Sequence, residues 1–301
     1  MSGLDPNAGG ALVVPGGGGG GAHTSGTLAA RPASPAAGDT YEVTSGAATG
    51  DCYQCFVAGA WTLTSYTREY GDDTPSMLWS LDETSSAYAS SGSYSVPLTV
   101  TGSLLRTAMG YDGLTCPRFS GTAGIYAASA SAVAGVGLGI SNAPTALTLA
   151  AWVKPAAVDG HRSIVLCQYN SAFANPYYTG LAIITGAIRA LIVKGGAYQD
   201  LAGGTVGAGF WQHVGWTYSE GGDKKVRFYA NGILVSTSSA TTGADALDLG
   251  TTSRWVIGDL PGAFGECFAG QIASARVYDT AQPLSWWQDV YKRSAGLYRG
   301  Q

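Results

Sequence analysis

The sequence carries little charge and no cluster of it. Only 12% of its 301 residues are charged, the net charge is −4, and Lys and Arg never form a run. A nucleic-acid binder or a membrane-surface binder normally carries a basic patch, so we expect neither partner. No apolar run approaches the ~20 residues of a membrane span, and the segment Met1 to Asp5 lacks the features of a signal peptide. We therefore expect synthesis in the cytoplasm, without processing or membrane insertion.

Cysteines are also few. Cys52, Cys55, Cys116, Cys167 and Cys267 are scattered, unlike the dense, even framework of a small secreted domain. Cys52 and Cys55 have C-x-x-C spacing, but no second Cys or His pair completes a zinc site. We expect no disulfide scaffold and no metal site at this pair, and we interpret both residues as strand positions.

What the sequence does contain favours strands and tight turns. It has 45 Gly, 17 Tyr and 8 Trp, and it is poor in the long helix formers Glu and Lys. Alternation places Leu147, Leu149, Ala151 and Val153 on one face of a strand that Pro155 ends. Further strands are expected at 181–185, 188–193, 213–218, 255–257 and 271–278.

Two local signals give more detail. Asn231-Gly232, between the apolar segments 226–230 and 233–235, predicts a hairpin with a type I′ turn. The segment 283–292 is the one expected helix, with Leu284, Trp287 and Tyr291 on one side.

Residues 1–30 form a low-complexity segment with an unbroken glycine run. Such a segment is either a flexible tail or an anchoring arm threaded between other subunits of an assembly, and only surrounding chains would offset the entropy lost by ordering glycine. We expect the anchor. The residues expected to make it are Leu12, Val13, Val14, Gly16 and Gly21.

Residues 31–74 read as a small β module with Gly-rich turns. Arg31-Pro32, Ala37-Gly38-Asp39-Thr40-Tyr41, Tyr53-Gln54-Cys55 and Ala58-Gly59-Ala60-Trp61 resemble short segments of tail and fibre proteins of tailed bacteriophages. A module of this size buries little surface, so we expect it to attach to a neighbour.

Residues 75–294 resemble the laminin-G-like branch of the concanavalin A-like lectin/glucanase superfamily. The matching segments are 81–85, 149–155, 211–218, 226–235, 256–258 and 268–278. The resemblance implies an all-β fold, in which two antiparallel sheets pack as a jelly-roll sandwich. Residues 295–301 are then a short tail.

The sequence departs from this family where relatives read Ile-Asp-Glu-Val before the last strand. Here Ile272 is followed by Ala273 and Ser274, so both carboxylates are missing. This loss counts against the calcium ion that some relatives hold near that turn. Asp82 and Asp259, with Asp200, remain candidate ligands for a structural calcium, although each also fits a turn or surface position. We expect no other cofactor.

Catalysis is not expected. Glucanases of this superfamily need paired carboxylates, usually from an E-x-D-x-E strand, and no such strand occurs. No G-x-S-x-G elbow is present either. The histidines His23, His161 and His213 are expected to have structural roles.

Binding signals concentrate in the segment 169–178. It combines aromatic and amide side chains, which stack on sugar rings and hydrogen-bond to hydroxyls. The alternative is that these residues cover the rim of the sandwich or an intersubunit contact. The candidate ligand-binding residues are Phe173, Asn175, Tyr177 and Tyr178.

The order of arm, module and sandwich predicts a non-enzymatic structural protein of a tailed-bacteriophage virion, assembled in the host cytoplasm. Its partners would be other virion proteins and a host-surface glycan, and a homotrimer is the first expectation. Head decoration and a short head or tail fibre fit equally. The alternative is a stand-alone carbohydrate-binding lectin.

Overall fold

The computed structural model describes residues 23–27, 40–45, 51–57, 60–66, 75–83, 86–108, 115–130, 143–160, 163–170, 178–242, 246–249, 253–260 and 266–298. Contacts divide the chain into a small unit and a large unit. The predicted anchor residues Leu12, Val13, Val14, Gly16 and Gly21 lie outside the described residues.

The small unit is a four-stranded sheet with the order β1-β2-β3-β4. Its strands are β1 (His23–Thr27), β2 (Thr40–Ser45), β3 (Asp51–Val57) and β4 (Ala60–Tyr66). β1 runs parallel to β2, and the other pairs are antiparallel. β1 belongs to the segment predicted as an arm; the sequence did not predict this strand because His23-Thr-Ser-Gly-Thr27 has no apolar alternation.

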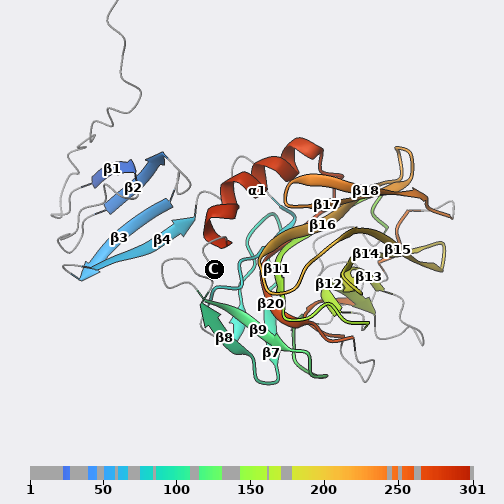
Figure 1. Ribbon diagram of the computed structural model, residues 1–301, viewed down its shortest axis with the longest axis horizontal. Coiled ribbons are helices and arrows are strands. Elements are labelled where there is room, and N and C mark those ends of the chain that lie inside the picture. Colours follow the sequence, from blue (N-terminus) through green and yellow to red (C-terminus); the bar gives the residue numbers. More distant parts are fainter. Residues whose placement is uncertain are drawn as a thin grey trace, which may run out of the picture. The chain divides into compact units, whose positions relative to one another are not determined.

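The large unit is a sandwich of two antiparallel sheets, as predicted (Figure 1). One sheet, called the β15–β6 sheet, has the order β15-β14-β13-β12-β19-β10-β7-β6. Its strands are β6 (Ala87–Tyr88), β7 (Leu98–Thr101), β10 (Tyr126–Ser129), β12 (Ser163–Asn170), β13 (Tyr178–Ile184), β14 (Ala187–Lys194), β15 (Ala197–Thr205) and β19 (Ser253–Ile257).

The second sheet, called the β18–β8 sheet, has the order β18-β17-β16-β11-β20-β9-β8, and β5 pairs with β20. Its strands are β5 (Met77–Trp79), β8 (Leu105–Ala108), β9 (Thr115–Ser120), β11 (Ala146–Pro155), β16 (Gln212–Ser219), β17 (Lys225–Ala230), β18 (Ile233–Ala240) and β20 (Ala269–Tyr278). In both sheets, strands that are distant in sequence lie side by side.

The main core lies between the facing sides of the two sheets. Leu147, Leu149, Ala151 and Val153 of β11 all belong to it, which confirms the predicted face. Trp216 of β16 is also fully buried, and its indole nitrogen donates to the Gly180 carbonyl oxygen at 3.1 Å. The bond satisfies the one polar group of a large aromatic side chain, so the core can hold it without a desolvation penalty.

The predicted hairpin joins β17 to β18. Asn231 and Gly232 have φ values of 52° and 78°. A type I′ turn needs positive φ at both central residues, and Asn and Gly tolerate it best. The hairpin prediction is confirmed.

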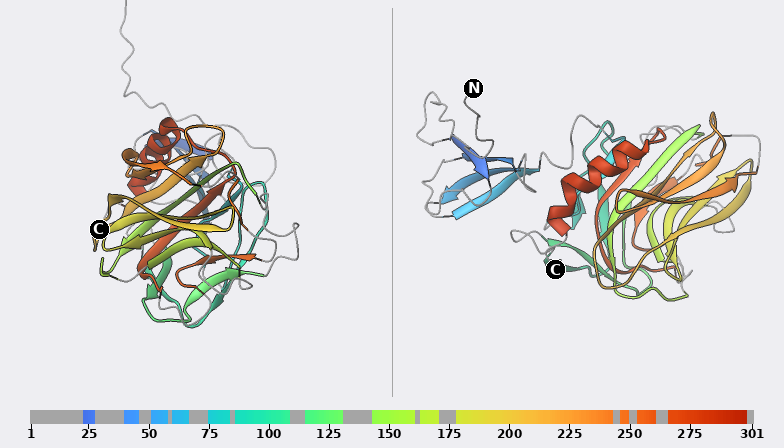
Figure 2. Two further views of the ribbon diagram at one scale, coloured as in Figure 1. Left: turned by 90° about the vertical axis from the view of Figure 1, so that its right-hand side faces the viewer. Right: turned by 45° about the horizontal axis from the view of Figure 1, so that its top comes forward.

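Helix α1 (Leu284–Tyr298) lies on the outer side of the β18–β8 sheet (Figure 2). Trp286, Trp287 and Val290 make its buried face, whereas Leu284, which was expected on the same side of the helix as Trp287, is 42% exposed. The helix also continues beyond the predicted end. Tyr298, in the segment expected as a tail, stacks on Trp152 with ring centroids 4.3 Å apart. No helix in the described part of the chain has the length and apolar character to cross a membrane.

Candidate functional site

The predicted binding loop joins β12 to β13. Phe173, Asn175 and Tyr177 lie outside the described residues, as does the side chain of Tyr178, whose backbone begins β13 opposite Tyr169. Tyr169 and Tyr178, the described residues on either side of it, pair at the end of the β15–β6 sheet where β12 finishes. Whether these four side chains bind a ligand stays a prediction.

A pocket opens at the opposite end of the sandwich, where β12 begins at Ser163 opposite Ile183 of β13. Its volume is about 260 Å³. The described residues that line this rim pocket are Gly121, Ala123, Ala157, Asp159, Ser163, Cys267 and Ala269. They come from the segments that follow β9 and β11, the start of β12, the segment that leads into β20, and the first residue of β20.

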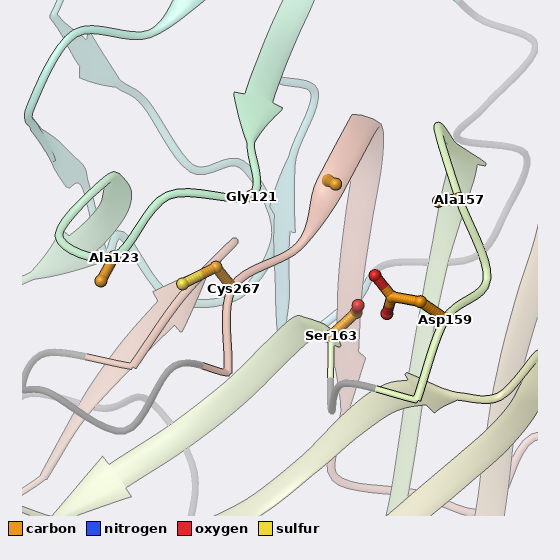
Figure 3. A pocket seen from close by; sticks show the side chains of 7 residues that line it. Gly121, Ala123, Ala157, Asp159, Ser163 and Cys267 are labelled. Carbon is orange, nitrogen blue, oxygen red and sulfur yellow. The ribbon is translucent and has the colours of Figure 1, made fainter.

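Three side chains give the rim pocket its polar chemistry. Figure 3 shows the Asp159 carboxylate and the Ser163 hydroxyl pointing toward one another, with the Cys267 sulfur on the other side near Ala123. Backbone hydrogen bonds fix the surrounding loops: the Thr185 amide donates to the Asp159 carbonyl oxygen at 2.9 Å, and the Gly121 amide donates to the Phe268 carbonyl oxygen at 3.1 Å. The pocket is thus built on loops that the strands hold in place.

Asp259 lies next to Cys267 and is fully buried. One of its carboxylate oxygens accepts from the Gly124 amide at 2.7 Å, which holds the loop between β9 and β10. The sequence interpretation of Asp259 as a turn or surface residue was therefore incomplete, because its carboxylate is part of the interior. Burial and the nearby Asp259 raise the pKa of the Cys267 thiol to about 11, so this cysteine stays protonated near neutral pH and is a poor nucleophile.

The three aspartates considered for calcium are not brought together. Asp200 lies on β15, where a carboxylate oxygen is 3.4 Å from an Arg189 guanidinium nitrogen. Asp82 follows β5, and Asp259 follows β19. Within the described residues, no group of three or more His, Cys, Asp or Glu side chains could hold a metal ion.

The described strands carry few carboxylates. No described strand carries more than one Asp or Glu, so none presents two acids on one face. His213 cannot serve as an exposed base, because it is 1% exposed among Trp152, Trp286 and Trp287. Burial, and then the charge of Arg276, lower its pKa to about 3. His161 lies outside the described residues.

The outer side of the β15–β6 sheet is apolar and rich in tyrosine. Tyr169 of β12 is 9% exposed, and Tyr126 and Tyr198 are half-buried against the same cluster. The Arg189 and Asp200 pair lies at its β14 and β15 side, with each side chain 24% exposed. Ile164, Cys167 and Val256 of this cluster are fully buried, so its partly accessible aromatic members are Tyr126 and Tyr198.

Sequence reasoning missed the rim pocket. Its lining residues lie far apart in sequence, and four of the seven are Gly or Ala, which carry no chemical signal. Asp159 is followed by Gly160, and such a dipeptide indicates a turn rather than a pocket.

Comparison with known proteins agrees with this architecture. The family model of the concanavalin A-like lectin/glucanases superfamily matches residues 121–285, more than half of the chain. No curated protein sequence matches.

Three solved structures have a similar fold. The binding domain of Paraclostridial Mosquitocidal Protein 1 has a TM-score of 0.54 at 13% identity, over 71% of this chain and 51% of that one. The receptor binding domain of botulinum neurotoxin C/D mosaic serotype has a TM-score of 0.54 at 12% identity, over 73% and 51%. Trypanosoma rangeli sialidase has a TM-score of 0.51 at 16% identity, over 75% and 33%. This chain spans about half or less of their lengths, and at such identities the likeness shows the fold alone. With the family match and the two-sheet sandwich in agreement, the chain belongs to the concanavalin A-like lectin/glucanases superfamily.

Proposed function

We propose that this protein is a non-enzymatic structural component of a tailed-bacteriophage virion, a head decoration protein or a short head or tail fibre. In this proposal the N-terminal part attaches the protein to the particle as a homo-oligomer, with a trimer as the first expectation. The sandwich faces outward and adheres to a glycan on the host surface.

The observation that carries the proposal is the division of the chain into two units of different character. The small unit with strands β1 to β4 follows a Gly-rich segment and includes the sequence segments that resemble phage tail and fibre proteins. The sandwich has a hydrophobic core of its own. A protein that uses one unit for attachment and another for recognition has this organisation.

The sparse carboxylates support a role without catalysis. A glycosidase needs two carboxyl groups about 5–9.5 Å apart across the scissile bond. The strands of the sandwich that the structure describes hold only one acid, Asp200, and it pairs with Arg189. Turnover of a polysaccharide by the purified chain would contradict this part of the proposal.

The fold and the tyrosine-rich face support adhesion. Two of the structural neighbours are named as binding or receptor binding domains, and the outer side of the β15–β6 sheet carries the partly exposed Tyr126 and Tyr198. Aromatic rings of this kind can stack on sugars.

The virion role is tested on particles. Antibodies against the sandwich should label virus particles from a culture that expresses this chain, as seen by electron microscopy, and mass spectrometry of washed particles should recover it. Removal of residues 1–30 should abolish its incorporation and leave the sandwich folded. Recovery of the full chain only outside the particles would contradict the proposal.

The alternative is a stand-alone lectin, and a glycan array on the full chain addresses it. Saturable glycan binding that is lost on Tyr177→Ala and Tyr178→Ala, by a protein absent from particles, would favour the lectin. Binding by a protein that is incorporated into particles supports adhesion by the virion.

A further inference from the structure

We propose that the rim pocket binds a single neutral sugar ring, as the terminal residue of the recognised glycan. This inference rests on the adhesive part of the proposed function. It places the contact at the end of the sandwich where β12 begins, opposite the end at which Tyr169 pairs with Tyr178.

The size of the pocket selects one ring. Sites for drug-sized ligands usually enclose about 300–1,000 Å³, whereas the rim pocket has about 260 Å³. Ala123, Ala157 and Ala269 give it a small apolar wall. Such a wall can contact the C–H face of a sugar without obstructing the ring.

The polar groups select hydroxyls. Asp159 is the one charged side chain among the described lining residues, and Ser163 can both donate and accept. A carboxylate has about four acceptor positions, so Asp159 can accept from a sugar hydroxyl while it keeps its contacts within the protein. Hydrogen bonds to a charged acceptor are stronger than those to a neutral one.

The charge of the pocket also excludes a ligand class. No Lys, Arg or His is among its described lining residues, so none of them would compensate the charge of a sugar carboxylate that lay against Asp159. Like charges held close together repel each other. The pocket should therefore discriminate against uronic and sialic acids.

The pocket walls are fixed before a ligand binds. The Ala156 amide donates to the Ala269 carbonyl oxygen at 2.8 Å, and the Asp259 carboxylate holds Gly124. Gly121 has a φ of 76°, and a Cβ at this position would come within 2.9 Å of the Ala269 Cβ. Binding would then cost little ordering of the loops, which favours affinity from a small number of contacts.

The test uses the full chain and saturation-transfer difference NMR. Methyl glycosides of glucose, galactose and mannose are titrated beside the corresponding methyl uronosides and methyl sialoside. At least one neutral glycoside should bind saturably in the millimolar range, and the acidic sugars should bind at least about tenfold more weakly. Ala157→Trp, at an exposed wall position, should abolish binding by filling the pocket.

Two further variants test the polar side chains of the pocket one at a time. Asp159→Asn should weaken neutral-sugar binding at least about fivefold and narrow the gap between neutral and acidic sugars. Ser163→Ala should weaken it about threefold to tenfold. The matched control is Asp223→Asn, an exposed acid paired with Arg227 at the other end of the sandwich, which should change binding less than about twofold.

The outcomes distinguish the pocket from the wider proposal. Glycan binding by the full chain that Ala157→Trp and Asp159→Asn leave unchanged overturns the pocket and leaves adhesion standing. Tighter binding of acidic than neutral sugars also overturns it. If neither glycosides nor an array of longer glycans bind, the pocket and the adhesive role both fail.

Discussion

Replacement of His213 by phenylalanine should remove part of the acid sensitivity of folding. The imidazole lies on β16 under helix α1, with ring centroids 5.4 Å from both Trp152 and Trp287. Among the described residues neither ring nitrogen has a hydrogen-bond partner. The site thus holds a neutral ring and offers nothing that would stabilise an imidazolium.

The magnitude follows from the pKa. Burial and the charge of Arg276 lower the pKa of His213 from 6.5 to about 3 in the folded protein. Between these values the unfolded chain binds a proton that the folded chain does not, so stability is complete above pH 6.5 and falls as the pH falls. Each pH unit costs about 1.4 kcal/mol. At pH 5 the loss relative to neutral pH is about 2 kcal/mol.

Urea unfolding of the wild type and of His213→Phe, followed by tryptophan fluorescence at pH 7, 6 and 5, measures this effect. At pH 7 the two free energies of unfolding should agree within about 1 kcal/mol, because the phenyl ring replaces an imidazole that makes no hydrogen bond. Between pH 7 and pH 5, the free energy of unfolding of the wild type should fall by about 2 kcal/mol more than that of the variant. His213→Gln should lose the same pH dependence with a larger cost at pH 7. Parallel pH curves for all three proteins would refute the reasoning and show that the imidazole is solvated.

Other predictions concern charge burial and close packing. Glu220→Gln should destabilise the protein by about 2–4 kcal/mol at pH 7, because it leaves the buried ammonium of Lys194 without its carboxylate. Burial opposes ionisation of the Glu220 carboxyl, but the hydrogen bonds from lysine lower its pKa from 4.5 to about 2. The difference in stability between the wild type and Glu220→Gln should therefore disappear as the pH falls through this range. Addition of Lys194→Met to the Glu220→Gln variant should restore most of the stability. Gly215→Ala should cost about 3 kcal/mol or more in thermal or urea unfolding, because a Cβ would come within 2.1 Å of the Leu149 carbonyl oxygen. Gly221→Ala, with no atom within 4 Å, should change stability by less than about 1 kcal/mol, and equal effects of the two substitutions would contradict the packing argument.

Local patterns predicted much of the sandwich. Three signals depend only on residues that are neighbours in sequence, so one sequence reveals them. They are the apolar alternation in β11, the Asn231-Gly232 turn and the short motifs that resemble the family. β15 was not predicted, because Ala197–Thr205 mixes glycine with polar residues and is held mainly by pairing with β14. The buried face of helix α1, made by Trp286, Trp287 and Val290, was not predicted, because the three apolar residues grouped on one side of the helix do not show which side meets a sheet.

The sequence by itself determined the fold class, the low charge and the absence of a paired-acid strand, because composition and short-range periodicity carry these properties. Tertiary structure alone decided that His213 is a buried neutral ring, that Asp259 lies in the interior, and that Asp159, Ser163 and Cys267 line one pocket. These three pocket residues are far apart or separated by turns in the chain, and only the register of β strands distant in sequence brings them together. A neighbourhood made by such pairing leaves no periodic trace in the amino acids that form it.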